Sequence, residues 1–390
     1  MRLAVVGPTY PIKGGISHYT TLLVRALRKR HEVLFVSYEY QYPAWLYPGT
    51  GQTFDKETPI IEESEPLWHT LQPWSLTRIA KRMKEFGAEG VVLNWITHFF
   101  GWHIGQLARS IRKNIPSPII MICHNVRQHE NYPLEGRLTR MAFRGPHGFL
   151  VHSTEDRQNL LRMLPDAKVR KAHHPTYDIF ATSSDWTRQS ARAALGLNDE
   201  PMVLYFGAVR PYKGLKWLIE AAPAIIATVP GCQIWCVGDY WSGPEEFQRR
   251  SKELGVTFDP ARRESGGVRI VAQYTPNEEV GKYFHASDLV VLPYETATQS
   301  GIVQIAYGFD KPCLVTNVGG LPEVVLDGKT GYVVPPKDPR AIASRTAEFF
   351  SGGDELRRRM EAEIKQFRKV FDWDHMVNTI EEFVKELSGV

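Results

Sequence analysis

The segment from residue 286 to residue 336 contains a strand, a polar loop, a helix and a second strand, in that order. The apolar run Leu289–Leu292 stops at Pro293, polar residues follow as far as Gly301, and a helical run leads to a second apolar run, Cys313–Thr316. This order is the repeating unit of a parallel sheet. Ligands of such sheets bind beyond the carboxyl ends of the strands, so we expect the loop Tyr294–Gly301 to face a ligand.

The loops that follow these two strands have the composition of phosphate-binding turns. The residues directly before the predicted helix are small or polar: Thr298, Gln299, Ser300 and Gly301. At a helix start, free backbone amides and the helix dipole favour an anion. The second strand is followed by Gly319 and Gly320, which permit another tight loop. Two such loops on adjacent strands predict a phosphate-bearing ligand. The later segment Lys329–Val334 is typical of a hairpin-like end to the sheet.

Length and composition indicate a soluble protein with more than one domain. A chain of 390 residues is too long for one ordinary core. Its content of 43% hydrophobic and 23% charged residues is that of a globular protein. The formal net charge of +4 excludes a chain directed as a whole at polyanions, so no nucleic-acid partner is expected.

Cysteine usage and hydropathy predict a cytoplasmic protein. The four cysteines are scattered, which favours buried reduced thiols over disulfides or a metal site. No apolar run approaches the roughly 20 residues that span a bilayer. The first residues have the pattern of a strand rather than that of a signal peptide.

Strand ends in the first half of the chain carry glycines and histidines. The predicted strand Arg2–Val6 leads into a loop that contains Gly14 and Gly15, where a backbone can approach a ligand with no side chain in the way. A simple tight turn is the alternative. His98 and His124 each follow a predicted strand, in the position where the active-site loops of parallel sheets lie.

An aromatic segment, residues 38–48, follows the second predicted strand and includes Tyr42 and Trp45. Aromatic faces commonly line carbohydrate sites or apolar acceptor grooves, so this segment is an acceptor-side candidate. A packed surface loop is an equal alternative. The chain from there to Trp74 is polar and punctuated by prolines, which predicts a long connection.

Two cations follow the strand Met202–Phe206, which we expect to open the second half of the molecule. Arg210 and Lys213 stand in the loop before a predicted helix. A guanidinium fork and a point charge beside helix N–H groups suit a diphosphate. Two further predicted strands follow, and they end near Gly238 and Tyr274.

The stretch KPCLVTNVGGLPEVVLDGKTGYVVPP, residues 311–336, resembles the donor-binding region of family 4 glycosyltransferases. These are retaining enzymes of the GT-B fold that use an activated sugar, usually a nucleotide sugar. They typically carry two glutamates separated by seven residues, and the corresponding positions here are Ala297 and Ile305. A sub-branch with a Thr-Gln-Ser-Gly signature, lacking the paired glutamates, is closer to this chain.

The resemblance implies an α/β protein of the GT-B fold, with two doubly wound Rossmann-like domains facing each other across a cleft. Residues 1–180 would form the acceptor-side domain and residues 191–370 the donor nucleotide-sugar-binding domain. Residues 181–190 are small and polar, which suits a linker. The amphipathic helix within residues 371–390 would cross back to the first domain.

The resemblance also gives roles to the candidate residues. Arg210 and Lys213 would bind the donor pyrophosphate and stabilise the leaving nucleotide, and His124 would contact the donor sugar. Glu295 and Gln304 are the nearest polar residues to the missing glutamates, with Glu295 contacting the sugar and Gln304 the ribose. The other donor-side residues would be Gly14, Gly15, Gly238, Tyr274, Thr298, Gln299, Ser300 and Gly301. The acceptor-side residues would be Tyr42, Trp45 and His98.

The resemblance thus implies a retaining, metal-independent glycosyltransferase of the hexosyltransferase type, with no cofactor and a nucleotide-diphosphate sugar as co-substrate. The expected acceptor is a glycan or lipid-linked glycan of the cell envelope. The resemblance and the basic residues of the predicted helix Leu76–Phe86 favour peripheral association with the inner face of the membrane, and solvated helix faces are the alternative. Two other functions stay open: a catalytically degenerate sugar-nucleotide-binding protein, which the absence of the paired glutamates favours, and a GT-B sugar-nucleotide epimerase.

Overall fold

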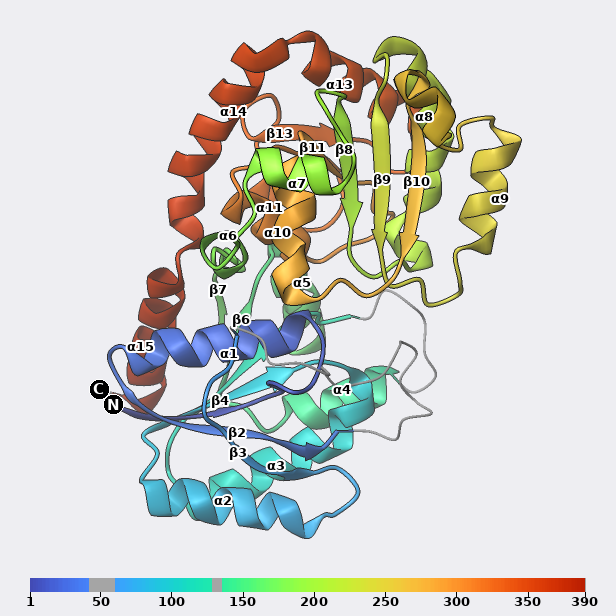
Figure 1. Ribbon diagram of the computed structural model, residues 1–390. Coiled ribbons are helices and arrows are strands. Elements are labelled where there is room, and N and C mark those ends of the chain that lie inside the picture. Colours follow the sequence, from blue (N-terminus) through green and yellow to red (C-terminus); the bar gives the residue numbers. More distant parts are fainter. Residues whose placement is uncertain (42–59, 128–134, 390) are drawn as a thin grey trace. The chain divides into compact units, whose positions relative to one another are not determined.

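The computed structural model describes residues 1–41, 60–127 and 135–389, which form two compact units (Figure 1). Unit 1 comprises Met1–Pro175 and Phe371–Val390, and unit 2 comprises Thr176–Val370. Each unit is a parallel β-sheet with helices on both faces. The prediction of an α/β protein with two Rossmann-like sheets is confirmed.

The sheet of unit 1 has seven parallel strands in the order β3-β2-β1-β4-β5-β6-β7. Its strands are β1 (Arg2–Val6), β2 (Glu32–Tyr40), β3 (Glu65–His69), β4 (Gly90–Trp95), β5 (Ile119–Cys123), β6 (Gly148–Val151) and β7 (Val169–Lys171). Its helices are α1 (Gly15–Arg28), α2 (Trp74–Phe86), the 3-10 helix η2 (His98–Phe100), α3 (Gly101–Asn114), α4 (Glu135–Phe143), α5 (Thr154–Met163) and α15 (Trp373–Ser388). The central strands are buried on both faces, as expected of a parallel sheet.

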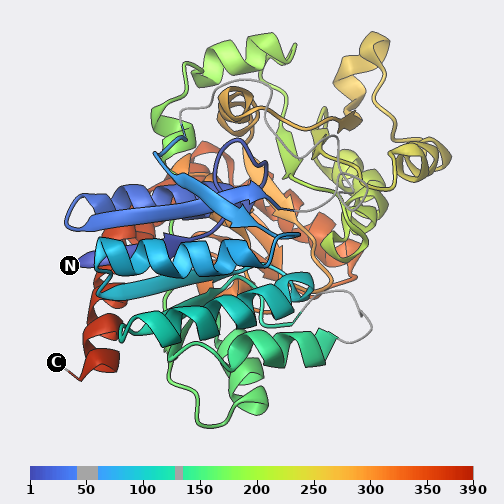
Figure 2. The same cartoon turned by 90° about the horizontal axis from the view of Figure 1, so that it is seen from below.

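Helices α2 and α3 cover one face of this sheet, and α1 and α15 cover the other (Figure 1). Seen from below, α2, α3 and α4 lie side by side (Figure 2). Glycines allow α15 to pack directly on the strands. A Cβ at Gly148 would lie 2.4 Å from Cζ of Phe383, and one at Gly90 would lie 3.0 Å from the side chain of Val384. The last helix of the chain therefore belongs to unit 1.

The sheet of unit 2 has six parallel strands in the order β10-β9-β8-β11-β12-β13. Its strands are β8 (Met202–Phe206), β9 (Gln233–Gly238), β10 (Gly267–Ala272), β11 (Leu289–Leu292), β12 (Cys313–Thr316) and β13 (Gly331–Val334). Its α-helices are α6 (Ile179–Thr182), α7 (Arg188–Ala194), α8 (Leu215–Thr228), α9 (Glu245–Glu253), α10 (Asn277–Ala286), α11 (Gly301–Gly308), α12 (Leu321–Val324), α13 (Pro339–Ser351) and α14 (Gly353–Phe367). Its 3-10 helices are η3 (Pro211–Lys213), η4 (Pro260–Ser265) and η5 (Arg368–Phe371), the last of which ends at the first residue of the returning segment.

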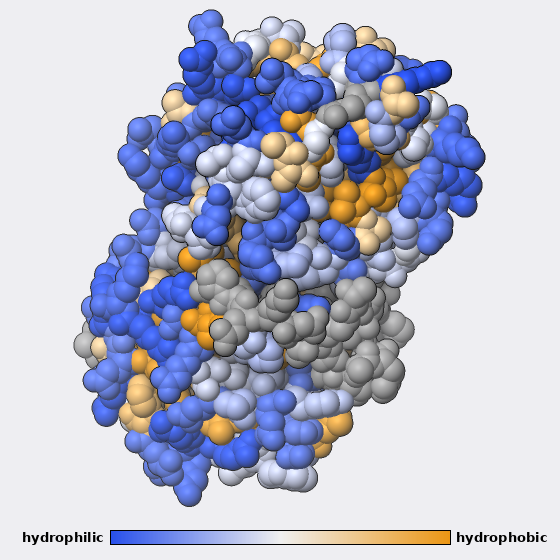
Figure 3. Space-filling view, in the orientation of Figure 1, coloured by the Kyte–Doolittle hydropathy of each residue, from blue (hydrophilic) through white to orange (hydrophobic). Residues whose placement is uncertain are grey.

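Alternate residues of β8 face opposite layers of unit 2. Val203 and Tyr205 belong to the apolar core that includes α8 and α13. Phe206 points to the other face, where its ring lies 6.2 Å from Tyr283 and 5.0 Å from Phe284 of α10. Helix α9 packs beside α8 and presents a hydrophilic surface at the side of the unit (Figure 3). None of the helices among the described residues is both long and apolar enough to cross a membrane.

The expectation of a hairpin-like end to the second sheet is wrong. Strand β13 pairs with β12 in parallel, from Cys313 opposite Gly331 to Thr316 opposite Val334. Helix α12 and the turn after it carry the chain back to the amino end of β12 before β13 begins. A parallel crossover and a hairpin can both contain a turn rich in glycine, so this turn signal does not distinguish them.

The polar segment before Trp74 contains a strand where a long connection was expected. Strand β3 pairs with β2 at the edge of the first sheet, with irregular register around Tyr38. Pro66 lies within it, and an edge strand tolerates proline because one side of the strand has no partner. At the other boundary, residues 183–187 of the expected linker connect α6 and α7, and both helices belong to unit 2.

Candidate functional site

The strand order of unit 2 reverses between β8 and β11, which are neighbours in the sheet. Ligands of doubly wound sheets bind at such a switch point, beyond the carboxyl ends of the strands. The loop after β8 carries Arg210 and Lys213, and the loop after β11 carries residues 298–300 and leads into Gly301, the first residue of α11. The topology of the unit therefore brings together the two groups of candidate residues that the sequence separates widely.

Glycines hold the loops after β8 and β11 in contact. Gly214 ends η3 with φ +65°, and a Cβ there would lie 2.0 Å from the carbonyl oxygen of Pro293. The left-handed φ and the close approach both require glycine. A Cβ on Gly207 would lie 3.2 Å from Cδ1 of Ile302 and 3.8 Å from Nζ of Lys213. The Lys213 ammonium is thus near the first turn of α11.

The two cations of the β8 loop lie against aromatic rings. Nζ of Lys213 is 5.5 Å from the centre of the Tyr294 ring, and Cζ of Arg210 is 4.3 Å from the centre of the Trp241 ring. Within the described part of the chain, Lys213 makes no ion pair with a carboxylate. Burial lowers the pKa of Lys213 to about 8, and the nearby charge of Arg210 contributes to this. An anion in this loop would supply the opposite charge that Lys213 lacks.

Helix α11 begins with amides that no side chain caps. Its N-cap residue Ser300 makes no side-chain hydrogen bond to the helix, and its hydroxyl lies 3.4 Å from that of Tyr294. Free amides at a helix start, together with the helix dipole, favour an anion. The start of α11, Arg210 and Lys213 form a site whose chemistry suits a diphosphate.

Two glutamines of this segment have unused hydrogen-bonding capacity. The Oε1 atoms of Gln299 and Gln304 are buried and have no hydrogen-bond partner among the described residues. Gln304 as a residue is only 1% exposed. Buried polar atoms are normally paired, so both amide oxygens are available to a donor group from a ligand.

The loops after β11 and β12 are also joined. The amide of Gly320 donates to the carbonyl of Thr298 at 3.1 Å. Gly319 has φ +54°, and a Cβ there would lie 1.4 Å from the carbonyl oxygen of Ala297. The predicted second tight loop thus packs directly on the first one.

Glu295 is engaged in ion pairs. Its carboxylate accepts hydrogen bonds from Nζ of Lys216 at 3.0 Å, Nε1 of Trp217 at 2.8 Å and Nζ of Lys337 at 3.1 Å. Burial acts to raise the pKa of Glu295, but these hydrogen bonds outweigh it and the pKa lies below its usual value. Glu295 is therefore an ionised group that ties the β11 loop to α8 and to the loop after β13.

The remaining donor-side candidates of unit 2 follow β9 and β10. A Cβ at Gly238 would lie 1.8 Å from the carbonyl oxygen of Gly207, so Gly238 lets the loop after β9 touch the loop after β8. Tyr274 is half-buried after β10, the edge strand, and β9 lies between that strand and β8. Gly238 thus adjoins the cation loop, whereas Tyr274 stands farther along the same edge.

In unit 1 the strand order reverses between β1 and β4. Gly14 precedes α1 with φ +126°, and no described atom lies within 4 Å of a Cβ built on Gly14 or on Gly15. The backbone of this loop is therefore open to approach. His98 is buried at the start of η2, in the loop after β4.

His124 directly follows β5 and is 2% exposed. Its Nε2 lies 3.1 Å from Oδ1 of Asn94, whose Nδ2 donates to the carbonyl of Val6 at 3.1 Å. A carbonyl only accepts, so this contact orients the Asn94 amide and makes Nε2–H of His124 the donor. Burial, with His152 and His174 adding to it, holds the pKa of His124 well below its usual value. His124 is a neutral imidazole with its proton on Nε2.

Three buried histidines surround the ring of Tyr19. The ring centres of His124, His152 and His174 lie 4.6, 5.4 and 5.0 Å from it. Trp373 of α15 lies 5.4 Å away on the same ring. Among the described residues, no group of His, Cys, Asp and Glu side chains could hold a metal ion. The cluster is a packed, uncharged part of unit 1.

We expect stability to fall as the pH drops below 6.5. In the unfolded chain these histidines gain protons near pH 6.5, whereas burial lowers the pKa to about 4 for His152 and to about 3 for His174. The unfolded state therefore binds more protons in this window, and acid favours it. His152 alone should lower the free energy of unfolding by about 3 kcal/mol between neutral pH and about pH 4. Denaturant unfolding at a series of pH values measures the slope.

The control for this expectation is His152→Gln, which keeps a polar side chain but removes one titrating group. Its free energy of unfolding should depend less on pH than that of the wild type. Equal slopes in the two proteins would show that His152 does not contribute.

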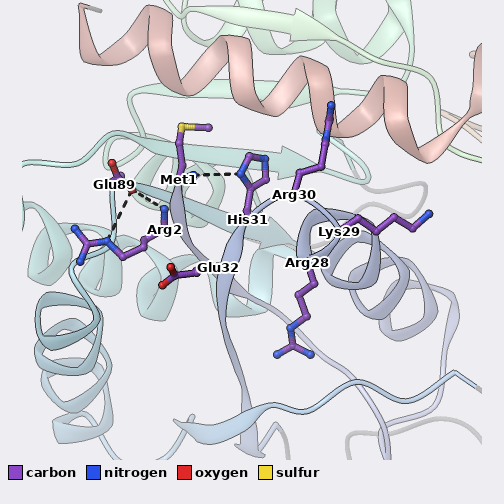
Figure 4. A pocket seen from close by; sticks show the side chains of 8 residues that line it. All are labelled: Met1, Arg2, Arg28, Lys29, Arg30, His31, Glu32 and Glu89. Atoms are coloured by element: carbon purple, nitrogen blue, oxygen red, sulfur yellow. Dashed lines mark hydrogen bonds and ion pairs between the residues drawn. The ribbon is translucent and has the colours of Figure 1, made fainter.

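The pocket of about 610 Å³ in Figure 4 lies at the amino ends of the strands of unit 1, away from these residues. Its lining residues are Met1, Arg2, Arg28, Lys29, Arg30, His31, Glu32 and Glu89. Figure 4 shows Arg2 turned to Glu89, with an ion pair at 3.9 Å. Arg28 pairs with Glu62 at 2.8 Å, and Arg30 with Glu381 of α15 at 3.1 Å. Because these cations are already paired within unit 1, we assign the pocket no ligand.

Two predicted acceptor-side residues cannot be placed in the structure, and two residues that contact predicted site residues were not predicted. Tyr42 and Trp45 lie outside the described residues. Trp241 and Asn94 were not predicted to belong to a site. Asn94 is a polar residue inside the otherwise apolar strand β4, and that irregularity is a signal that could have found it. Trp241 stands in an ordinary polar loop, and nothing local distinguishes it.

Residues 200–351 match the protein-family model described as Glycosyl transferases group 1. The match covers less than half of the chain. The matched region runs from β8 to α13, so it includes the loop with Arg210 and Lys213 and the start of α11.

Relatives with curated names align over most of the chain. A D-inositol 3-phosphate glycosyltransferase from Nocardioides is 27% identical over 303 residues, which are 72% of this chain and 64% of that protein. The chain thus spans less than two thirds of that relative's length. A GDP-mannose-dependent alpha-(1-6)-phosphatidylinositol monomannoside mannosyltransferase from Mycolicibacterium smegmatis is 25% identical over 381 residues, which are 90% of this chain and 89% of that protein.

Solved structures support the fold. The Anabaena protein HepE, in complex with UDP, has a TM-score of 0.71 and 15% identity, with 99% of this chain and 100% of that chain covered. At this identity the likeness concerns the fold alone. The fold is GT-B, as the resemblance of residues 311–336 implied.

Proposed function

We propose that the protein is a retaining glycosyltransferase that moves a sugar from a nucleoside-diphosphate sugar to a glycan or lipid-linked glycan of the cell envelope. One observation carries the proposal: Arg210, Lys213 and the start of α11 gather at the switch point of unit 2, within the region that matches the group 1 glycosyltransferase family model. The two relatives described above are named for glycosyl transfer to inositol-containing acceptors, and HepE was solved with UDP.

The cations and helix amides would stabilise the leaving group. In this proposal an acceptor hydroxyl attacks the anomeric carbon while the bond from that carbon to the phosphate oxygen breaks. Negative charge then grows on the diphosphate, where Arg210, Lys213 and the α11 amides lower its energy. The acceptor proton passes to the departing phosphate on the same face of the sugar, which gives retention. This step needs neither a metal nor a cofactor.

Glu295 is not available as a proton donor, because its carboxylate is ionised and held by Lys216, Trp217 and Lys337. Its role in the proposal is to keep the β11 loop in place beside the sugar. Gln299 and Gln304 offer buried amide oxygens for donor hydroxyls.

A lipid-linked acceptor would bring the enzyme to a membrane surface. The start of α2 bears Trp74, which is 67% exposed, and Leu71 before it is 63% exposed. Lys81 on the same helix has a largely exposed side chain. Exposed aromatic and basic residues on one helix suit the boundary of an anionic bilayer, which supports peripheral association.

A catalytically degenerate sugar-nucleotide-binding protein is the second candidate. It is favoured by the replacement of the paired glutamates by Ala297 and Ile305, and by the ion pairs that occupy Glu295. Such a protein would bind the nucleoside diphosphate through the same cations. It would leave the sugar bond intact.

A panel of nucleoside-diphosphate sugars, incubated with the protein without and then with glycan acceptors, tests the proposal. We expect slow hydrolysis of one donor and faster transfer when an acceptor is present, with NMR showing the donor's anomeric configuration in the product. Tight binding without turnover of any donor would support the degenerate protein. Conversion of a donor to its epimer with no acceptor present would instead identify an epimerase.

A further inference from the structure

Trp241, in the loop after β9, stacks on the guanidinium of Arg210. The distance from Cζ of Arg210 to the Trp241 ring centre is 4.3 Å, and Tyr212 lies near the same guanidinium at 5.5 Å. We propose that Trp241 is a positioning residue, which holds Arg210 in the orientation that receives the diphosphate of the donor. This inference rests on the proposed function.

Pairing between the two loops makes Arg210 and Trp241 neighbours. The amide of Val209 donates to the carbonyl of Asp239 at 2.8 Å, and Val209 forms a parallel bridge with Tyr240. The next residues in this register are Arg210 and Trp241. In parallel pairing, residues in register project to the same side, which places the indole beside the guanidinium.

The backbone next to Trp241 is held firmly. Tyr240 is buried, its hydroxyl donates to the carbonyl of Cys236 at 3.1 Å, and its ring lies 5.6 Å from Phe247 of α9. Gly238 lets this loop touch the carbonyl of Gly207. The backbone that carries the indole is therefore held in place, and a flexible arginine that rests on the indole has less conformational freedom to lose when an anion binds.

The contact with Trp241 involves the ring face of the indole. A guanidinium that stacks on a ring does so with its plane, whereas its N–H donors point outward in that plane. Contact with Trp241 is thus compatible with donation from Arg210 to phosphate oxygens. If Trp241 instead stacked on the nucleotide base, Arg210 would lose its contact with the indole, because the base would have to displace the guanidinium.

Inorganic pyrophosphate distinguishes these two roles because it has no base. Calorimetric titrations with pyrophosphate, UDP and GDP would compare the wild type with Trp241→Ala, Trp241→Phe, Arg210→Ala and the double variant Trp241→Ala/Arg210→Ala. We expect Trp241→Ala to weaken pyrophosphate and the nucleotide by the same factor, about tenfold. Trp241→Phe should recover most of the affinity. In the double variant, loss of Trp241 should add little to the loss of Arg210.

The titration results distinguish the positioning role of Trp241 from contact with the base and from failure of the proposed function. If Trp241→Ala weakens only the nucleotide, Trp241 contacts the base and the positioning role is overturned. If Trp241→Ala binds as the wild type does, or if the two single losses add fully, the role is overturned as well. If the wild type binds neither pyrophosphate nor a nucleoside diphosphate, the proposed function fails and this role fails with it. Thermal unfolding of each variant checks that the fold is intact.

Discussion

Lys213→Ala should lower kcat/KM for the nucleoside-diphosphate donor by about 100- to 1000-fold, the loss typical when one charge-stabilising donor is removed from a preorganised site. Lys213 lies near the first turn of α11 and makes no ion pair within the described part of the chain, so a diphosphate would be its main counter-charge. Initial rates of donor hydrolysis measure the effect. Lys252→Ala, an exposed lysine on α9, is the control and should behave as the wild type.

The pH dependence of donor binding gives a second readout of the same residue. Burial and Arg210 lower the pKa of Lys213 to about 8, so the ammonium of the free protein deprotonates above that pH. The binding constant should be constant below about pH 8 and decrease above it, since only the charged form attracts the diphosphate. Lys213→Arg should shift the decrease to higher pH. A wild-type binding constant unchanged up to about pH 9.5 would contradict the role of Lys213.

Asp288→Ala should lower the free energy of unfolding by about 3–5 kcal/mol, the range for breaking a buried ion pair. The Asp288 carboxylate accepts from Arg188 at 2.5 Å and from the amide of Met202 at 2.8 Å. Arg192, which is 6% exposed, and Arg357 lie 3.8 and 3.5 Å from it. Removal of the carboxylate leaves a buried arginine without its counter-charge and an amide without its acceptor. Denaturant unfolding followed by circular dichroism measures the loss.

Asp354→Ala is the matched control for Asp288→Ala. Asp354 also pairs with Arg357, at 2.8 Å, but its side chain is 65% exposed. Exposed ion pairs contribute about 1 kcal/mol or less, so this variant should lose little. Similar losses in the two variants would mean that burial does not determine the contribution of Asp288. Asp288 precedes β11, at the end of the sheet opposite the cation loop, so donor binding by folded Asp288→Ala should be unchanged.

Much of each sheet follows from local sequence pattern. The apolar runs that predicted β1, β8, β11 and β12 are strands in the structure with the same bounds. The glycine pair at 319–320 and residues 298–300 lie in loops at the carboxyl ends of strands, where anion-binding loops were expected, and Gly301 begins α11. These features depend on residues close together in the chain, because strand and turn preferences are set by neighbouring side chains and by backbone conformation.

Other features could not be predicted from the local sequence pattern. The direction of β13 was wrongly expected, because a glycine-rich turn serves a crossover as well as a hairpin. The edge strand β3 was missed because its polar residues and its proline are tolerated only where a strand has one neighbour. The ion pairs of Glu295 with Lys216 and Lys337 join the β11 loop to α8 and to the loop after β13, and no spacing rule connects these segments.

The sequence by itself determined the α/β class, the two-unit organisation and the loops that carry Arg210, Lys213 and residues 298–301. Only the tertiary structure decided which of those loops are neighbours: that Arg210 rests on Trp241, and that Lys213 lies near the first turn of α11. The physical reason is the distance along the chain over which each kind of interaction acts. Hydrophobic period and turn chemistry act over a few residues, whereas the order of parallel strands arises from the packing of both sheet faces, which involves residues from the whole unit.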